Sequence, residues 1–282
     1  MMKDVLRKMA TLDRRWTFLA IGLAAVLPFL FPMGLAIKPT KEVRAVFDQV
    51  EALAGTGKPL VMSFDFDPGT DAELGPMADA IMLHAFKRKI PLIVTNFIYT
   101  GTGLAEIHLK KVAEPLGMVY GKDYVFLGNK VAYANVMINL ATDLRLSYLK
   151  DYYGKPIEDL PMLKGIRNYN DFGMVIGLSG TRLVEYWIIY GVGPYGFKYS
   201  IGCTAVSATD MYPYMQRGQS IGMIGGMKGA AEYEQLLVNA GIAPKLADAA
   251  RGLDSQSLCH LVIIGFILVG NIAFFAGGRR RV

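Results

Sequence analysis

The sequence predicts an α/β protein, in which a Rossmann-like three-layer domain with a mostly parallel sheet is flanked by one N-terminal and one C-terminal transmembrane helix. Two observations predict the domain: its strand-like runs are short and apolar throughout, and helical patterns separate them. A third predicts the membrane helices. Of 282 residues, 52% are hydrophobic and 19% charged, and the two longest charge-free stretches lie near the chain ends.

These two charge-free stretches predict membrane-spanning helices. One covers 16–37, and the other has its apolar centre at 258–276. Both are long enough, because an α-helix needs about 20 apolar residues to cross the roughly 30 Å hydrocarbon layer. We therefore predict transmembrane helices at 16–37 and 256–277. The first exceeds the apolar part of a signal peptide, so we interpret it as an uncleaved anchor.

The basic residues predict the orientation of the chain in the bilayer. The formal net charge of +6 divides between the segment 1–15 and the tail 278–282, and the middle, 38–255, is neutral. The positive-inside rule places both termini in the cytoplasm and the middle domain outside it, in the periplasm or an equivalent compartment. A neutral domain has no nucleic-acid footprint. The expected partners are therefore the lipid bilayer and other copies or other membrane proteins.

The first element after the N-terminal stretch is an amphipathic helix over 39–55. Its apolar residues recur at helical spacing, with charged residues between them, at Val43, Val46, Phe47, Val50 and Leu53. We expect this helix to lie next to the membrane. Its apolar face packs either on the domain or on a neighbouring copy.

An alternation of strands and helices follows. Apolar runs predict strands at 59–66, 90–97, 124–128, 171–179, 197–206 and 220–225. Helical patterns predict helices at 72–87, 104–116, 136–149, 183–191, 210–217 and 230–240. The irregular stretch 151–170 separates two halves of about three strands each. Cys203 falls in the domain and Cys259 in the second span, so no disulfide is expected.

The ends of the predicted strands carry the polar residues suited to a ligand. In an open parallel sheet, ligands bind beyond the carboxyl ends of the strands, near the point where the strand order reverses. The residues there that suit a small anionic ligand are Asp65, Asp67, Thr95, Asn96, Thr100, Ser179, Thr181 and Lys228.

The strand-end sequence Asp65-Phe66-Asp67 is similar to the first motif of haloacid-dehalogenase-type phosphohydrolases. The resemblance implies Asp65 as nucleophile, Asp67 as acid/base and Mg²⁺ between them, with Thr95 and Lys228 in the family's threonine and lysine roles. Gly69 departs from the motif, which has Thr or Val there, and no acidic pair follows the fourth strand. From the residues alone, Asp67 caps the turn at 68–69 and Asp71 caps the next helix.

Three glycine-rich segments have packing interpretations. Residues 191–196 spell GxGxxG, but a strand rather than a helix follows, so we predict a tight turn. TGTG at 100–103 and GGMKG at 225–229 precede helices, where backbone N–H groups can hold an anion; close helix–strand packing is the favoured reading of both. The three histidines show no zinc-binding spacing.

The second predicted span carries a packing face of polar and small residues, formed by Asn271, Ala273 and Gly277. This face joins either the two spans of one chain or two protomers.

These observations favour a membrane-anchored extracytoplasmic α/β domain that acts as a structural or interaction subunit of an oligomeric membrane complex, rather than as an enzyme. That reading requires no cofactor. The alternative is a protein that binds a small anionic ligand, or a metal-dependent phosphohydrolase-like enzyme that uses Asp65 and Asp67 as catalytic groups and Mg²⁺ ligands.

Overall fold

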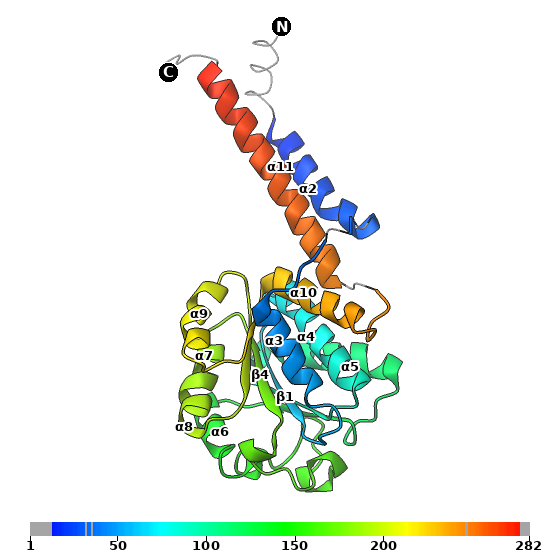
Figure 1. The fold of residues 1–282 in the computed structure, drawn as a ribbon, viewed down its shortest axis with the longest axis vertical. Coiled ribbons are helices and arrows are strands. Elements are labelled where there is room, and N and C mark those ends of the chain that lie inside the picture. Colours follow the sequence, from blue (N-terminus) through cyan, green and yellow to red (C-terminus); the bar gives the residue numbers. More distant parts are fainter. Residues whose placement is uncertain (1–12, 32, 35, 246–247, 277–282) are drawn as a thin grey trace. The chain divides into compact units, whose positions relative to one another are not determined.

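The computed structural model describes residues 13–31, 33–34, 36–245 and 248–276 (Figure 1). The chain forms two compact units, residues 37–249 and residues 1–36 together with 250–282. The first is an α/β domain and the second contains two apolar helices of different length.

A six-stranded parallel sheet forms the centre of the α/β domain, as the sequence predicts. Its order is β3-β2-β1-β4-β5-β6. The strands are β1 (Leu60–Asp65), β2 (Leu92–Asn96), β3 (Tyr124–Asn129), β4 (Met174–Ser179), β5 (Tyr199–Cys203) and β6 (Met223–Gly225). This is the doubly wound order, which reverses between β1 and β4, so the carboxyl ends of those two strands mark the switch point.

The central strands are buried on both faces, which explains their uninterrupted apolar runs. Every residue of β1 and β4 is buried, and the two strands pair in register from Leu60 with Met174 to Asp65 with Ser179. The last residue of each is polar. The register therefore places Asp65 beside Ser179 at the switch point.

Helices cover both faces of the sheet and complete three layers (Figure 1). On one face lie α3 (Lys41–Glu51), α4 (Asp71–Lys87), α5 (Thr102–Ala113) and α10 (Gly226–Asn239). On the other lie α6 (Tyr133–Asn139), α7 (Leu183–Trp187), α8 (Gly193–Tyr195) and α9 (Ala208–Gln216). Trp187 is fully buried in the core under this second layer.

The amphipathic helix predicted at 39–55 is α3, and its apolar face packs on its own domain. Val46 and Val50 have no exposed surface. The Phe47 ring stacks on the His84 ring with centroids 4.5 Å apart, and it meets Tyr233 of α10 edge to face. Of the two predicted positions for this face, the structure therefore shows the intramolecular one.

Two local predictions need correction. The helix predicted at 136–149 ends after Asn139 and does not continue to 149, because the backbone is extended at Asp143, with φ at −157°. The Asp143 carboxylate accepts the Arg145 N–H at 2.8 Å and starts a separate 3-10 turn, η3 (Leu144–Leu146). The GxGxxG segment is not a tight turn. A π-helical stretch, η7 (Ile188–Val192), continues into α8, and Gly196 ends it with a left-handed φ of 66°.

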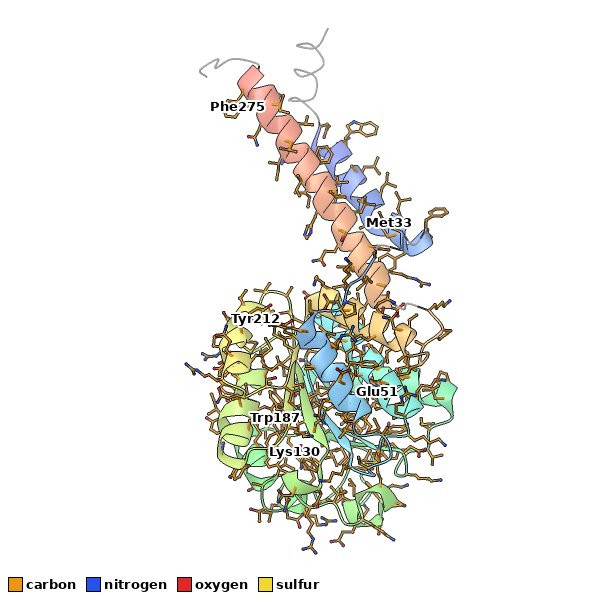
Figure 2. The ribbon with its side chains drawn as sticks, viewed as in Figure 1. Met33, Glu51, Lys130, Trp187, Tyr212 and Phe275 are labelled. Carbon is orange, nitrogen blue, oxygen red and sulfur yellow. The ribbon has the colours of Figure 1, made fainter. Side chains whose placement is uncertain are left out.

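The second unit contains α2 (Arg14–Leu30) and α11 (Asp248–Ala276), which pack against each other. The Ser255 hydroxyl donates to the Ala25 carbonyl at 2.8 Å, and the Asp254 carboxylate accepts the Met33 N–H at 3.1 Å. Most of their large apolar side chains point outward (Figure 2). α11 begins in the α/β unit with Asp248 and Ala249 and continues into this one.

One helix among the described residues is long and apolar enough to cross a membrane, and it is α11. In the most apolar 18-residue stretch of Asp248–Phe275, only 6% is buried. The helix predicted at 16–37 is shorter than expected: α2 has 17 residues and includes Pro28 in its last turn. At 1.5 Å per residue it spans roughly 26 Å. Residues 1–12, Gly277 and the tail 278–282 lie outside the described residues.

Candidate functional site

The switch point is built around Asp65, the last residue of β1. Its carboxylate accepts the Phe97 N–H at 2.7 Å and the Ser63 hydroxyl, and the Trp187 indole lies beside it. Burial raises the pKa of Asp65 to about 7, although the hydrogen bonds from Ser63 and Phe97 act in the opposite direction. Asp65 has no exposed surface. Its carboxyl group therefore joins β1 to the segment after β2 and faces the protein interior.

The polar residues at the end of β2 also bond within the protein. The Asn96 side-chain N–H donates to the Phe64 carbonyl at 2.7 Å. Its oxygen accepts from the Thr102 hydroxyl at 3.0 Å and from the Asn129 amide at 2.8 Å. The Thr95 hydroxyl pairs with the buried Tyr148 hydroxyl. Both predicted ligand-binding residues, Thr95 and Asn96, thus lie at the expected edge but connect neighbouring segments there.

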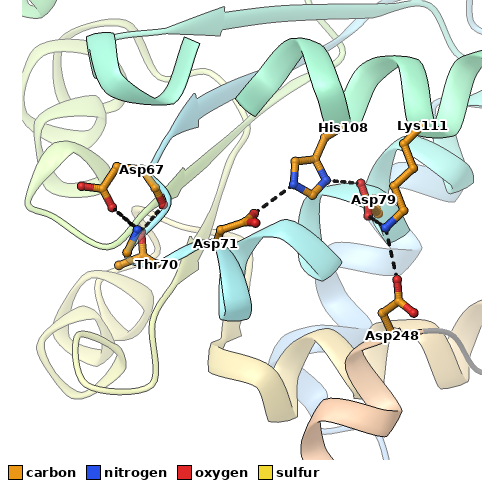
Figure 3. Close-up of polar contacts among 8 residues, drawn as sticks. Asp67, Thr70, Asp71, Asp79, His108, Lys111 and Asp248 are labelled. Carbon is orange, nitrogen blue, oxygen red and sulfur yellow. Dashed lines mark hydrogen bonds and ion pairs between the residues drawn. The ribbon is translucent and has the colours of Figure 1, made fainter. Parts of the chain in front are cut away.

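Asp67 has the turn-capping role that the residue pattern predicts (Figure 3). Its Oδ1 accepts the Gly69 N–H at 3.0 Å and lies 3.5 Å from the Thr70 hydroxyl. The capping role predicted for Asp71 is wrong. Thr70 is the residue before α4, and the Asp71 carboxylate instead bonds His108 at 2.9 Å.

The loop after β4 closes against the loop after β1. The Ser179 hydroxyl accepts the Thr181 N–H at 3.0 Å and lies 2.9 Å from the Thr181 hydroxyl. A Cβ atom added at Gly180 would lie 2.8 Å from Cγ2 of Thr70, so the two loops touch across the switch point. Ser179 is buried, whereas the Thr181 side chain is exposed.

Lys228 is not brought together with Asp65. It follows β6, which lies three strands from β1, or roughly 14 Å at the usual strand spacing. Its ammonium group donates to the buried Glu232 carboxylate, which also accepts the Thr40 hydroxyl at 2.6 Å. Thr100 is exposed in the short turn η1 (Tyr99–Gly101). Glu232 fixes the start of α3 to α10, and Lys228 supplies the cation that pairs with Glu232.

The glycines of the two anion-like loops allow close packing. A Cβ atom at Gly101 would lie 2.0 Å from the Phe66 carbonyl oxygen. Gly226 has a φ of 60°, and a Cβ atom there would lie 2.7 Å from the Ala205 Cβ. These contacts agree with the packing interpretation of both loops.

A charged network that sequence reasoning missed lies between α4 and α5 (Figure 3). The His108 ring contacts Asp71 at 2.9 Å and Asp79 at 2.6 Å. Lys111 bridges Asp79 at 2.8 Å and Asp248 at 3.1 Å. Burial lowers the pKa of His108, but the hydrogen bonds and charges of the two aspartates outweigh it and raise that pKa above its usual value. The one available signal was His108 and Lys111, three apart on one helix face.

Beside this network, a mostly apolar groove of about 240 Å³ lies between α4, α5 and α10. Its apolar lining includes Pro76, Leu83, Val112, Leu116 and Leu237. The contributing helices are far apart in sequence, so no local motif points to the groove.

Three loops at the carboxyl edge of the sheet each expose one large apolar side chain. Tyr99 after β2 is 81% exposed, Val131 after β3 is 82% exposed and Val206 after β5 is 85% exposed. We call these three the carboxyl-edge residues; they follow strands that lie up to four strand spacings apart in the sheet. Parallel strands direct all three loops to the same edge. Sequence reasoning selected polar residues at this edge and overlooked these apolar ones.

Within the described part of the chain, no group of three His, Cys, Asp or Glu side chains is placed to hold a metal ion. In comparisons with protein-family models, curated proteins and solved structures, the chain shows no significant match. Only the site geometry and the chemistry of the chain itself therefore bear on its function.

Proposed function

We propose that this protein is a membrane-anchored α/β domain that acts as a structural or interaction subunit of an oligomeric membrane complex. In this proposal α2 and α11 both span the bilayer, both termini are cytoplasmic and the α/β domain is extracytoplasmic. The proposal has an anchoring part and an interaction part, and each is supported by different residues.

The observation that carries the anchoring part is the outward-facing apolar surface of α11. Leu261, Ile267 and Phe275 are 63%, 55% and 78% exposed. Such a surface is costly in water and stable in hydrocarbon. α2 adds a second apolar surface, with Phe18 70% exposed. The sequence after α2 stays uncharged as far as Ile37, which lengthens the apolar stretch available to the first span.

The carboxyl-edge residues support the interaction part. Exposed apolar residues are common singly, but here three loops at one edge each present one. Polar groups at the same edge, such as Asp65 and Ser179, are buried in hydrogen bonds within the protein. A protein partner that covers this edge would bury Tyr99, Val131 and Val206. Interfaces are typically built from such apolar and aromatic contacts.

The experiment is the native mass of the complex extracted from its own membranes in mild detergent. We expect a mass well above that of one chain. Replacing Val131 and Val206 by Asp should reduce it, because a charge would be buried in the interface. The matched control is Val119→Asp, which alters a 54% exposed valine before β3, at the opposite edge of the sheet. A wild-type protein with the mass of one chain would refute the proposal.

The alternative is a small-ligand site at the same edge, with Asp65 and Asp67 as Mg²⁺-dependent phosphohydrolase-like groups. It is less well supported, because the Asp65 carboxylate is enclosed and Lys228 pairs with Glu232. A single chain that copurifies with phosphate or Mg²⁺, and loses it in the Asp67→Asn variant, would favour this alternative.

A further inference from the structure

The two faces of α11 differ in what covers them within its own unit. One face packs on α2: the Ser255 hydroxyl donates to the Ala25 carbonyl, and the Cys259 Sγ lies 3.8 Å from the Ile21 carbonyl oxygen. Ala273, which is 5% exposed, comes eighteen residues after Ser255. Eighteen residues are about five helical turns, so Ala273 lies on the Ser255 face.

The opposite face carries two exposed polar side chains, His260 and Asn271. The predicted grouping of Asn271 with Ala273 on one face is therefore wrong, because two residues turn an α-helix by about 200°. They are eleven residues apart, about three turns, and lie roughly 140–160° around the helix from Ser255. Ile264 and Ile267 lie between them on the same face and are 51% and 55% exposed. The spacing 260, 264, 267 and 271 alternates four and three residues, which is the seam of a left-handed helix pair.

Asn271 sets the requirement for a partner on this face. It precedes the last described residue of α11, Ala276, by five residues, or roughly 8 Å along the helix. In the proposed span, 256–277, an asparagine side chain is too short to reach water over that distance. In hydrocarbon its donors and acceptor need a hydrogen-bonding partner, and polar residues in membrane helices usually find one on another helix.

We propose that this face binds the same face of α11 in a second copy of the chain. Copies inserted with the same topology run parallel, so each places its Asn271 at the same depth. A carboxamide both donates and accepts, and it is therefore complementary to its own copy. Another protein would need a polar group at that depth, whereas a second copy has one by construction. This inference rests on the proposed function and names one of its partners.

Cysteine crosslinking in native membranes tests the contact. In a Cys203→Ser, Cys259→Ser background, Ile267→Cys should give a disulfide-linked dimer. The matched control is Val269→Cys, two residues away and towards the α2 face, where Val269 is half-buried. Crosslinking of Val269→Cys but not of Ile267→Cys would overturn the inference. So would an Ile267→Cys product that contains a different protein, although the proposed function would then stand.

A substitution series tests the role of the amide. Asn271→Leu makes the helix more apolar, so insertion is retained, and self-association in detergent should weaken roughly 3- to 20-fold, the range expected for one or two interhelical hydrogen bonds. Adding Ile272→Asn moves the amide about 100° around the helix at the same depth and should not restore association. Unchanged association of Asn271→Leu in an oligomeric wild type would overturn this inference alone. A monomeric wild type would overturn the proposed function as well.

Discussion

Replacing Asp65 by Asn should stabilise the folded protein above neutral pH. Asparagine has nearly the same shape and keeps both contacts: its oxygen accepts the Phe97 N–H, and its amide donates to the Ser63 hydroxyl, which turns to accept. The substitution removes the negative charge that Asp65 acquires in a fully buried position.

The size of the effect follows from the pKa of Asp65. Burial raises it from 3.8 in the unfolded chain to about 7 in the folded protein. A raised carboxyl pKa costs no stability below pH 3.8, an increasing amount between pH 3.8 and pH 7, and a constant amount above pH 7. The difference of roughly 3 units corresponds to up to about 4 kcal/mol in the free energy of unfolding.

Urea unfolding of the full chain in detergent, measured at several pH values, tests this prediction. Trp187 lies beside Asp65 and reports the transition by fluorescence, with Trp16→Phe in both proteins to remove the other tryptophan signal. The variant and the reference should be about equally stable near pH 4 and diverge as the pH rises to 7. A variant less stable than the reference at pH 8 would refute the reasoning, because the ionised carboxylate would then be net stabilising.

Three further substitutions test the packing and charge networks by the same urea assay. His108→Gln should lower the free energy of unfolding by about 1.5–3 kcal/mol at pH 6, because hydrogen bonds to charged groups are lost. Since the pKa of His108 is raised, this loss should shrink at alkaline pH, where His108 is deprotonated in the unsubstituted protein. A loss that does not depend on pH would contradict this prediction. Gly75→Ala places a Cβ atom against the Asp71 carboxylate oxygen and 2.8 Å from the His108 ring, and it should cost about 1–3 kcal/mol. Gly103→Ala meets no atom within 4 Å and should be neutral or slightly stabilising, so equal effects of the two substitutions would argue against the clash. Lys228→Met should cost about 1–3 kcal/mol by leaving buried Glu232 without its cation, and an unchanged midpoint would show that the pair contributes nothing.

The sheet was predictable because its signal is local. Strands buried on both faces read as continuous apolar runs, and each ends near the residue where the sequence pattern changes, as β1 does at Asp65. The order of the strands was not predictable in detail, because nothing near Leu60 indicates that it pairs with Met174. Helix ends were missed where a single side chain intervenes, as Asp143 does after α6.

Only parts of the candidate site were predictable: Asp65 and Ser179 lie side by side at the switch point, whereas Lys228 lies three strands away. The pattern correctly put polar residues at the carboxyl edge. It did not reveal that Asn96 bonds Phe64 and Asn129, because those partners come from other strands. Long-range partners decide whether a polar side chain faces a ligand or the protein interior. The His108 network was missed for the same reason, since its carboxylates belong to another helix.

The switch in strand order has a consequence for how the chain folds during synthesis. The central pair joins β1 to β4, whose partners Leu60 and Met174 are separated by more than a hundred residues. Such non-local pairing is slow to form. β1 can pair with β2 early, but its other edge stays open until β4 has left the ribosome. During that interval the apolar N-terminal stretch is already available for insertion, so in our proposal the sheet closes on a chain that is tethered at one end.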